Sequence, residues 1–267
     1  MTLVKLKKTM NELEQYFRQN NKRLIHKWIH YFDIYDRHFA RFKAKEITIL
    51  EIGVYHGGSL QMWKHYFGDK AKIYGIDINP QCKEMEEENV KIFIGSQSDR
   101  KFLREIKKLI PHVDILIDDG GHMMTQQIVS YEELFDHVKA NGVYLCEDIH
   151  TSYRLKYGGG YNRKGTFIEY SKIFIDFLNA YHSQQNALKI NRFTESVDSI
   201  HYYDSILVIE KRKREKPHDE KTGTISFLES KQKQSRIVIM TEKISYVFIK
   251  IINITLRFLK LPSFIWK

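Results

Sequence analysis

The sequence predicts an α/β fold with a mostly parallel sheet, an antiparallel hairpin at the sheet edge, an N-terminal helical lid and a C-terminal amphipathic helix. Two observations support this. From residue 47 onward, continuous apolar runs typical of buried parallel strands alternate with helix-like runs. The last two strand-like runs have no helix between them, as in an antiparallel pair. With 267 residues, the chain can form one large domain with appendages.

Five parallel strands are expected in order along the chain, over 47–53, 71–78, 90–95, 113–118 and 143–148. Helices are expected between them over 60–67, 98–109 and 125–138, with Ser59 capping the first and Ser98-Asp99 starting the second. Asn141-Gly142 is expected to be a break before the fifth strand. A helix over 167–181 then precedes the hairpin, whose strands are expected over 188–196 and 199–211.

Four segments follow from these patterns. Residues 1–45 are predicted to be helical from about Thr9 to Phe42, because apolar and aromatic residues recur there at spacings of three and four. We expect this segment to cover the main domain as a lid or to form an oligomer contact. The main domain is predicted over 46–211, a basic polar linker over 212–236 and an amphipathic basic tail over 237–267.

The positive charge of the chain is concentrated at its C-terminal end. The net charge is +10, of which residues 1–210 carry +1 and residues 211–267 carry +9. A neutral body argues against a nucleic-acid groove across the fold. Only two cysteines occur, Cys82 and Cys146, and no secretory signal is visible at the N-terminus, so we expect a reducing, cytoplasmic setting.

The tail has the pattern of a basic amphipathic helix. Polar residues recur at intervals of three and four; they are Lys243, Tyr246, Lys250, Asn253, Arg257 and Lys260. Charges interrupt the apolar residues too often for a membrane-spanning segment. Such a helix, with Trp266 near its end, either lies in the interface of a membrane or packs on the enzyme or a partner subunit.

Carboxylates collect where the expected strands end, at Glu51, Asp77, Asp118, Asp119, Glu147 and Asp148. The carboxyl ends of parallel strands meet at one edge of a sheet, and ligands bind outside that edge. A sheet built only for stability has no need of six carboxylates there, because burying them costs free energy. This edge is therefore the predicted functional site.

The first strand ends in a glycine-rich turn. Gly53, Gly57 and Gly58 allow a tight connection and close approach of a ligand to the backbone. The pattern is not the dinucleotide fingerprint GxGxxG, and the preceding Glu51 suits a cationic amino-acid ligand better than a pyrophosphate. Asp77 follows 24 residues after Gly53 and can either bind the two hydroxyls of a ribose or cap a helix.

Three carboxylates should converge at the ends of the fourth and fifth strands, from Asp119, Glu147 and Asp148. Unpaired, they would repel one another and raise one another's pKa. Mg²⁺ resolves this repulsion, since it prefers carboxylate oxygens, unless Lys or Arg residues neutralise the cluster or some side chains point away. His122 is a candidate general base, because histidine titrates near neutral pH, and His150 and His56 lie on the same rim.

These motifs resemble a known family. "ILEIGVYHGGSLQMW", "YGIDINP", "GSQSD", "ILIDDGGH" and "YLCEDIHTSY", in this order, are similar to class I S-adenosylmethionine-dependent methyltransferases with a Rossmann-like sheet. More narrowly, they resemble the metal-dependent O-methyltransferases that act on sugar hydroxyls of macrolides, rhamnosides and polysaccharides, a group that includes cephalosporin hydroxylase-like proteins. The resemblance covers roughly Lys27 to Lys211.

The resemblance implies roles for individual residues. Cofactor binding falls to the loop residues Glu51, Gly53, Tyr55, Gly57 and Ser59 for methionine, Asp77 for ribose, Ser96 and Gln97 for adenine, and Asp118 near the methionine end. It implies that Asp119, Glu147 and Asp148 hold the metal and that His122 is the general base. Gly121 departs from the family pattern, which often has Ser there.

The activity implied is Mg²⁺-assisted methylation of a sugar hydroxyl of a glycan or glycoside, with S-adenosylmethionine as methyl donor. A non-sugar hydroxyl is the alternative acceptor, and a membrane-docked binding module without catalysis is the alternative class of protein. The Tyr- and Gly-rich loop over 153–165 suits a cover over the acceptor, since loops this long are often functional. We expect a cytoplasmic homo-oligomer that binds no nucleic acid, and the membrane alternative for the tail would place it at the inner membrane face.

Overall fold

The computed structural model describes residues 10–184, 186–227 and 236–259. The chain divides into two compact units, Met1–Pro217 and His218–Lys267. Both cysteines are free and buried in the first unit.

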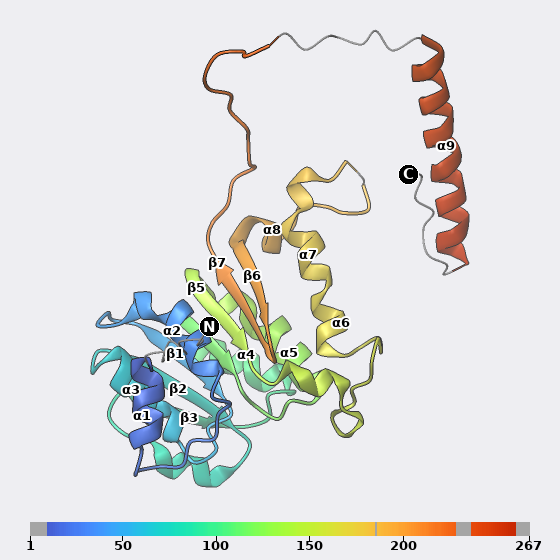
Figure 1. The fold of residues 1–267 in the computed structure, drawn as a ribbon. Helices are drawn as coiled ribbons and strands as arrows, with labels where there is room; N and C mark the ends of the chain where they lie inside the picture. The colour runs from blue at the N-terminus through green and yellow to red at the C-terminus, as the bar shows by residue number, and fades with distance from the viewer. Residues whose placement is uncertain (1–9, 185, 228–235, 260–267) are drawn as a thin grey trace, which may run out of the picture. The chain divides into compact units, whose positions relative to one another are not determined.

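The first unit is built on a seven-stranded sheet with the order β3-β2-β1-β4-β5-β7-β6 (Figure 1). β7 runs antiparallel to both of its neighbours, and the other strands are parallel to one another. The predicted fold class is confirmed. The strands are β1 Thr48–Ile52, β2 Lys72–Asp77, β3 Val90–Ile94, β4 Val113–Asp118, β5 Val138–Cys146, β6 Val197–Tyr203 and β7 Ile206–Lys211.

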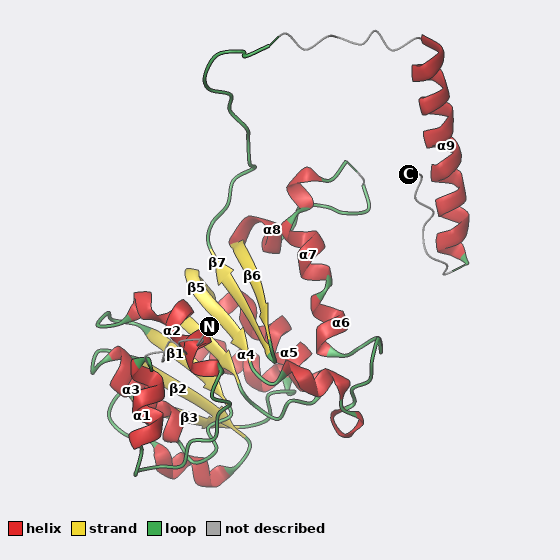
Figure 2. Ribbon diagram, in the orientation of Figure 1, coloured by secondary structure: helices red, strands yellow, loops and turns green. Residues whose placement is uncertain are grey.

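Helices cover both faces of the sheet (Figure 2). One face packs against α1 Glu12–Gln19, α2 Tyr31–Phe39 and α3 Gly58–Phe67. The other packs against α4 Arg100–Leu109, α5 Met124–Leu134, α6 Phe167–Ser171, α7 Ile173–Leu178 and α8 Arg192–Ser196. Short 3-10 helices occupy Ala40–Phe42, Pro80–Met85, Phe135–His137, Ile149–Tyr153, Leu155–Tyr157 and Ala180–His182. Burial on both faces explains why the central strands are continuous apolar runs.

The strand register brings the candidate site together. Ile52 of β1 pairs with Asp118 of β4, and Asp118 pairs in turn with Cys146 of β5. The residues that follow these three, Gly53, Asp119 and Glu147, therefore leave the sheet side by side.

The predicted edge hairpin exists, but its first strand was placed wrongly. Residues 188–196 contain α8 rather than a strand, and β6 and β7 both come from the second run, joined through Asp204 and Ser205. Asn191 begins α8 by accepting a hydrogen bond from the Thr194 backbone N–H at 3.1 Å. This N-cap chemistry outweighs the β-like composition of the run.

The predicted single helix from Thr9 to Phe42 is also wrong. Two helices, α1 and α2, are separated by residues 20–30, and residues 1–9 lie outside the described part of the chain. Asn20 ends α1 in an extended conformation, and its side chain donates to the Arg23 carbonyl at 2.9 Å. This local turn directs the following segment across the carboxyl ends of the strands.

Smaller differences concern helix ends. Gly57, with φ +72°, is the N-cap of α3, whereas the predicted cap Ser59 lies inside the helix. Asn141-Gly142 is not a break but lies within β5, where the pairing with β4 shifts register. The predicted helix over 167–181 is divided into α6, α7 and a 3-10 turn, whereas the predicted start at Asp99 is confirmed as the N-cap of α4.

The second unit contains α9, Arg236–Phe258, a helix of 23 residues. Residues 212–227 form neither helix nor strand. Of the predicted polar positions in the tail, Lys260 lies outside the described residues, as does Trp266. Within the described residues, none of the helices combines the length and the apolar character needed to cross a membrane.

Candidate cofactor and metal site

A cavity of about 480 Å³ lies at the carboxyl ends of β1 to β5. Its walls come from the loops after these strands and from the segment that joins α1 to α2. The predicted site residues that line it are Gly53, Tyr55, Asp77, Ser96, Gln97, Asp119, His122, Glu147 and Asp148. The sheet therefore brings most of the predicted site into one cavity.

Gly53 allows two strand-end loops to touch. Its φ is +93°, and a Cβ at this position would lie 2.0 Å from the backbone oxygen of Asp119. The Gly53 N–H donates to the Ile76 carbonyl at 2.8 Å, and the Asp119 N–H donates to the Ile52 carbonyl at 2.9 Å. Only glycine fits both the conformation and the contact.

Asp77 organises the loop after β1. Its Oδ2 accepts the backbone N–H groups of Val54 at 2.9 Å and Tyr55 at 3.0 Å. Its Oδ1 accepts the Asn79 N–H at 2.8 Å. Carboxylate oxygens accept more than one hydrogen bond each, so Asp77 can hold this loop and still receive ligand hydroxyls in the cavity.

Gln97 links the loops after β3 and β4. Its Nε2 donates to Asp118 Oδ1 at 3.1 Å, and its Oε1 accepts the Gly121 N–H at 2.7 Å. Ser96, beside it, is hydrogen-bonded to the Ser98 hydroxyl at 2.9 Å. Gln97 is buried but reaches the cavity, so it joins the adenine side of the predicted site to the carboxylate cluster.

Four predicted cofactor residues are not among the described residues that line the cavity: Glu51, Gly57, Ser59 and Asp118. Glu51 is fully buried and accepts the Ser59 hydroxyl at 3.0 Å, and burial raises its pKa to about 7. Asp118 accepts hydrogen bonds from the Ser130 hydroxyl and from Gln97, and burial raises its pKa to about 6. In this structure the Glu51 and Asp118 side chains therefore form hydrogen bonds within the protein and do not line the cavity.

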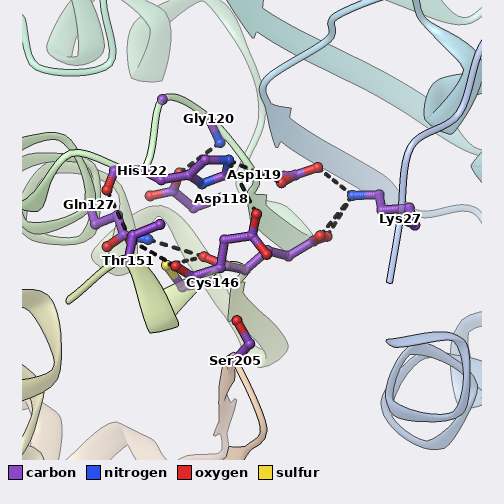
Figure 3. A network of polar contacts seen from close by, with 12 residues as sticks. Lys27, Asp118, Asp119, Gly120, His122, Gln127, Cys146, Thr151 and Ser205 are labelled. Carbon is purple, nitrogen blue, oxygen red and sulfur yellow. Dashed lines mark hydrogen bonds and ion pairs between the residues drawn. The ribbon is translucent and has the colours of Figure 1, made fainter. Parts of the chain in front are cut away.

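A buried lysine lies within the carboxylate cluster. Lys27 Nζ is 2.5 Å from Asp119 Oδ2 and 2.8 and 2.9 Å from the two oxygens of Glu147. Figure 3 shows the Lys27 and Asp119 side chains pointing toward one another. Burial alone would lower the pKa of Lys27, but the charges of Asp119, Glu147 and Glu51 outweigh it and raise that pKa. Lys27 therefore stays charged and compensates part of the cluster.

Glu147 is the most deeply buried member of the cluster. Its side chain is 1% exposed, and burial followed by repulsion from Asp119 raises its pKa well above the ordinary carboxyl value. The Tyr35 hydroxyl donates to Glu147 Oε1 at 2.7 Å. The Gln127 side chain donates to its backbone carbonyl at 3.1 Å. Glu147 is thus held by Tyr35 of α2, by Gln127 of α5 and by Lys27 of the segment that joins α1 to α2.

His122, Asp119 and Asp148 form a second group within the cluster. His122 Nε2 lies 3.5 Å from Asp148 Oδ2 and 3.9 Å from Asp119 Oδ1. One ligand atom from each of the three residues lies within 4.8 Å of the others, a spacing that could hold a metal ion. His122 and Asp148 have φ of +57° and +53°, and such left-handed backbone at non-glycine residues is concentrated at functional sites.

The Asp148 carboxylate is shared between two environments. The Tyr31 hydroxyl donates to its Oδ1 at 2.6 Å, whereas its Oδ2 faces His122. Lys27 likewise holds Oδ2 of Asp119, whereas Oδ1 of Asp119 faces His122. One oxygen of each aspartate is therefore turned toward the imidazole.

The other two candidate histidines are less well placed. His150 Nδ1 is hydrogen-bonded to the Ser205 hydroxyl and lies 3.8 Å from Asp148 Oδ1. The His56 ring packs against that of Tyr55 with a centroid distance of 4.2 Å. Neither is among the described residues that line the cavity.

Sequence reasoning missed Lys27, Tyr31, Tyr35 and Gln126. The signal for Lys27 was a single cation inside the apolar run "LIHKWI". Gln126 lines the cavity and explains the departure at Gly121, because a Cβ there would lie 2.4 Å from Gln126 Oε1. A serine at Gly121 would require Gln126 to move.

Residues 50–149 match a protein family described as a methyltransferase domain. A solved structure of the MycE methyltransferase from the mycinamycin biosynthetic pathway, in complex with Mg, SAH and mycinamycin VI, is similar to it. The TM-score is 0.66 and the identity 26%, over 86% of this chain and 58% of that chain. This confirms the Rossmann-like methyltransferase fold and the family resemblance.

Two curated proteins with sequences similar to this chain are O-methyltransferases. An 8-demethyl-8-alpha-L-rhamnosyl tetracenomycin-C 2'-O-methyltransferase of Streptomyces olivaceus is 34% identical over 70% of this chain and 52% of its own length. A mycinamicin VI 2''-O-methyltransferase of Micromonospora griseorubida is 34% identical over 66% of this chain and 47% of its own length. The chain therefore spans about half the length of the curated relatives it matches.

Proposed function

We propose that the protein transfers a methyl group from S-adenosylmethionine to a sugar hydroxyl of a glycan or glycoside. The observation that carries this proposal is the convergence of Asp119, His122 and Asp148 on one cavity with Gly53 and Asp77. Acid–base groups thereby stand beside a loop suited to the methyl donor. The relatives that methylate rhamnosyl and mycinamicin sugars support the choice of acceptor.

The cofactor is assigned to the half of the cavity formed by the loops after β1 to β3. Asp77 would bind the ribose, Gly53 and Tyr55 the methionine part, and Ser96 and Gln97 the adenine. Glu51, Gly57, Ser59 and Asp118 would act by holding these loops. The cavity volume of about 480 Å³ lies in the range of ligand pockets, roughly 300–1,000 Å³.

A hard divalent cation such as Mg²⁺ fits the donor set on the other half. Asp119 Oδ1 and Asp148 Oδ2 face the same point beside His122, and carboxylate oxygens are the ligands that Mg²⁺ prefers. Glu147 completes the proposed triad and would share its carboxylate with Lys27. When bound, the cation would lower the pKa of a coordinated hydroxyl.

His122 is the proposed general base. Its Nε2 would accept the proton of the sugar hydroxyl, and the neighbouring carboxylates of Asp119 and Asp148 would stabilise the imidazolium that forms. The sugar oxygen would then form a bond to the methyl carbon while the bond from that carbon to sulfur breaks, releasing S-adenosylhomocysteine. The fold's main contribution would be alignment of the oxygen with the methyl group.

Aromatic side chains at the opening are the proposed acceptor contacts. Trp28 lines the cavity and is 51% exposed. Tyr157, in the predicted cover loop, has its ring centroid 6.5 Å from that of His122. Aromatic faces offer flat apolar surfaces against which a sugar ring can pack, with hydroxyls left free for the carboxylates.

The test is transfer of labelled methyl from S-adenosylmethionine to a panel of rhamnosides, other glycosides and a catechol, with Mg²⁺ and with EDTA. Glycosides already methylated on the vicinal hydroxyls serve as controls. We expect transfer to a free glycoside, loss of transfer in EDTA and recovery on adding Mg²⁺. Transfer only to a catechol would favour the non-sugar acceptor, and binding without transfer to any hydroxyl would favour the non-catalytic module.

A further inference from the structure

We propose that α9 docks the protein on an anionic membrane surface. The helix belongs to the second unit of the chain, and the residues used in the proposed function all belong to the first. The proposal therefore stands or falls separately from the proposed function.

Within the second unit, several apolar side chains of α9 are exposed. Ile244, Val247, Phe248, Ile251, Ile254 and Phe258 are between 54% and 88% exposed. Their spacings of three and four residues place them along one side of the helix. Leaving such a stripe in water forgoes the stabilisation that burial gives, so a surface of this kind indicates a binding partner.

The charges around this stripe identify the partner. From residue 230 to residue 267 the sequence contains eight Lys or Arg residues and one acidic residue, Glu242. Lys243, Lys250 and Arg257 recur at intervals of seven, which returns to nearly the same side of a helix, and this side borders the apolar stripe. A helix that packs on a neutral protein surface needs no such excess of cations, whereas an anionic bilayer attracts each of them.

The geometry of binding follows from the same residues. Among the described helices none is suited to crossing a membrane, and Lys250 lies in the middle of α9. An amphipathic helix with a basic side instead lies in the plane of the interface, with its apolar side in the acyl boundary and its cations at the headgroups. The strongly apolar stripe argues against a nucleic acid as partner.

The test is flotation of the full-length protein with vesicles of phosphatidylcholine alone or with added phosphatidylglycerol. The double variant Phe248→Glu, Ile251→Glu removes the apolar anchor, and Lys250→Glu reverses one charge. Ile225→Glu is the matched control, because Ile225 is 83% exposed and lies outside the helix. Thermal unfolding and calorimetric binding of S-adenosylhomocysteine report on whether the first unit is intact in each variant.

We expect the wild-type protein to float with phosphatidylglycerol vesicles, less in high salt, and not with phosphatidylcholine alone. Lys250→Glu should lower the partition coefficient about 30-fold, the double variant should abolish flotation, and Ile225→Glu should change neither. Wild-type protein that does not float, or floats equally with neutral vesicles, would overturn the proposal. So would a double variant that floats normally, or one whose only change is loss of a dimer in light scattering.

Discussion

Lys27 is the residue that controls the charge balance of the candidate site. Its side chain is 3% exposed and contacts both Asp119 and Glu147. A buried carboxylate without a partner is strongly destabilising, so the lysine makes it possible for the cluster to exist without a bound cation. A metal ion and Lys27 therefore compensate the same negative charge.

Replacing Lys27 by Met should make folding depend on the metal. We expect the free energy of unfolding to fall by about 3–5 kcal/mol in EDTA, because the buried carboxylate of Glu147 and the partly buried one of Asp119 lose their cation. Mg²⁺ should recover more stability in this variant than in the wild type. Urea denaturation with and without Mg²⁺ measures both effects, and Lys22→Met, at an exposed lysine, is the control. Equal stability of Lys27→Met and wild type in EDTA would contradict the charge argument.

Replacing His122 by Ala should remove the general base. We expect turnover to fall by about 10²–10⁴-fold, whereas binding of S-adenosylhomocysteine should be unchanged. Steady-state methyl transfer and calorimetry measure the two quantities. His56→Ala, on the same rim but outside the cavity, should keep wild-type turnover. Wild-type turnover in His122→Ala would exclude it as the base.

Glu51 should make the protein less stable as the pH rises. Burial raises its pKa from the ordinary 4.5 to about 7, so the folded state favours the protonated form. Its contribution to stability is fully present below pH 4.5 and is lost as the pH rises through 7. Glu51→Gln should reduce the loss of stability between pH 5 and pH 8 by about 2–3 kcal/mol. Parallel slopes of the two proteins in denaturation against pH would contradict this.

At the scale of elements, the contact between the loops after β1 and β4 is what assembles the site. Gly53 is in this contact, whereas Gly68, with a similar φ of +89°, ends α3 in open space. A comparison of alanine variants at these two glycines therefore distinguishes the loss of stability caused by backbone strain from that caused by a lost contact between loops.

Gly53→Ala should damage both stability and cofactor binding, because its Cβ would collide with the Asp119 backbone 2.0 Å away. Gly68→Ala should lower the free energy of unfolding by about 1–3 kcal/mol through backbone strain alone, and it should bind S-adenosylhomocysteine normally. Denaturation and calorimetry on the pair measure the difference. Equal losses in the two variants would show that the loop contact does not matter.

Predictability from sequence differed between the elements. The buried parallel strands could be predicted because both of their faces are apolar, which leaves a continuous signal. The hairpin strand over 188–196 could not, since Asn191 and Thr194 form a helix cap within a β-like composition. The break between α1 and α2 was hidden because the apolar spacing continues through residues 20–30, although these residues form no helix.

The candidate site, like the fold, could be predicted from the sequence only in part. Carboxylates at strand ends are visible because strand ends are visible, so Asp77, Asp119, Glu147 and Asp148 were found. Lys27 reaches the cluster from a segment whose path depends on tertiary packing, and no local pattern encodes that path. Asp118 shares its strand end with Asp119, and only the structure shows that it turns toward Ser130 instead of the cavity.

At the scale of the whole molecule, the candidate site and most of the net positive charge lie in different segments of the chain. The first unit holds the sheet, the cavity and the residues that match the methyltransferase-domain family, whereas most of the net positive charge lies in the segment that contains α9. A basic helix in a separate unit can bind an anionic surface through residues that the candidate site does not use. Cofactor binding and membrane docking are therefore expected to respond to different substitutions.

The most direct test of the account is calorimetric titration of the EDTA-treated protein with S-adenosylhomocysteine, followed by titration with Mg²⁺. We expect cofactor binding in EDTA, weakened by Asp77→Asn, and a separate Mg²⁺ binding event that is lost in Asp148→Asn. Absence of S-adenosylhomocysteine binding to the folded protein would contradict the assignment of the cavity. Mg²⁺ binding that is unchanged in Asp148→Asn would contradict the assignment of the carboxylate cluster.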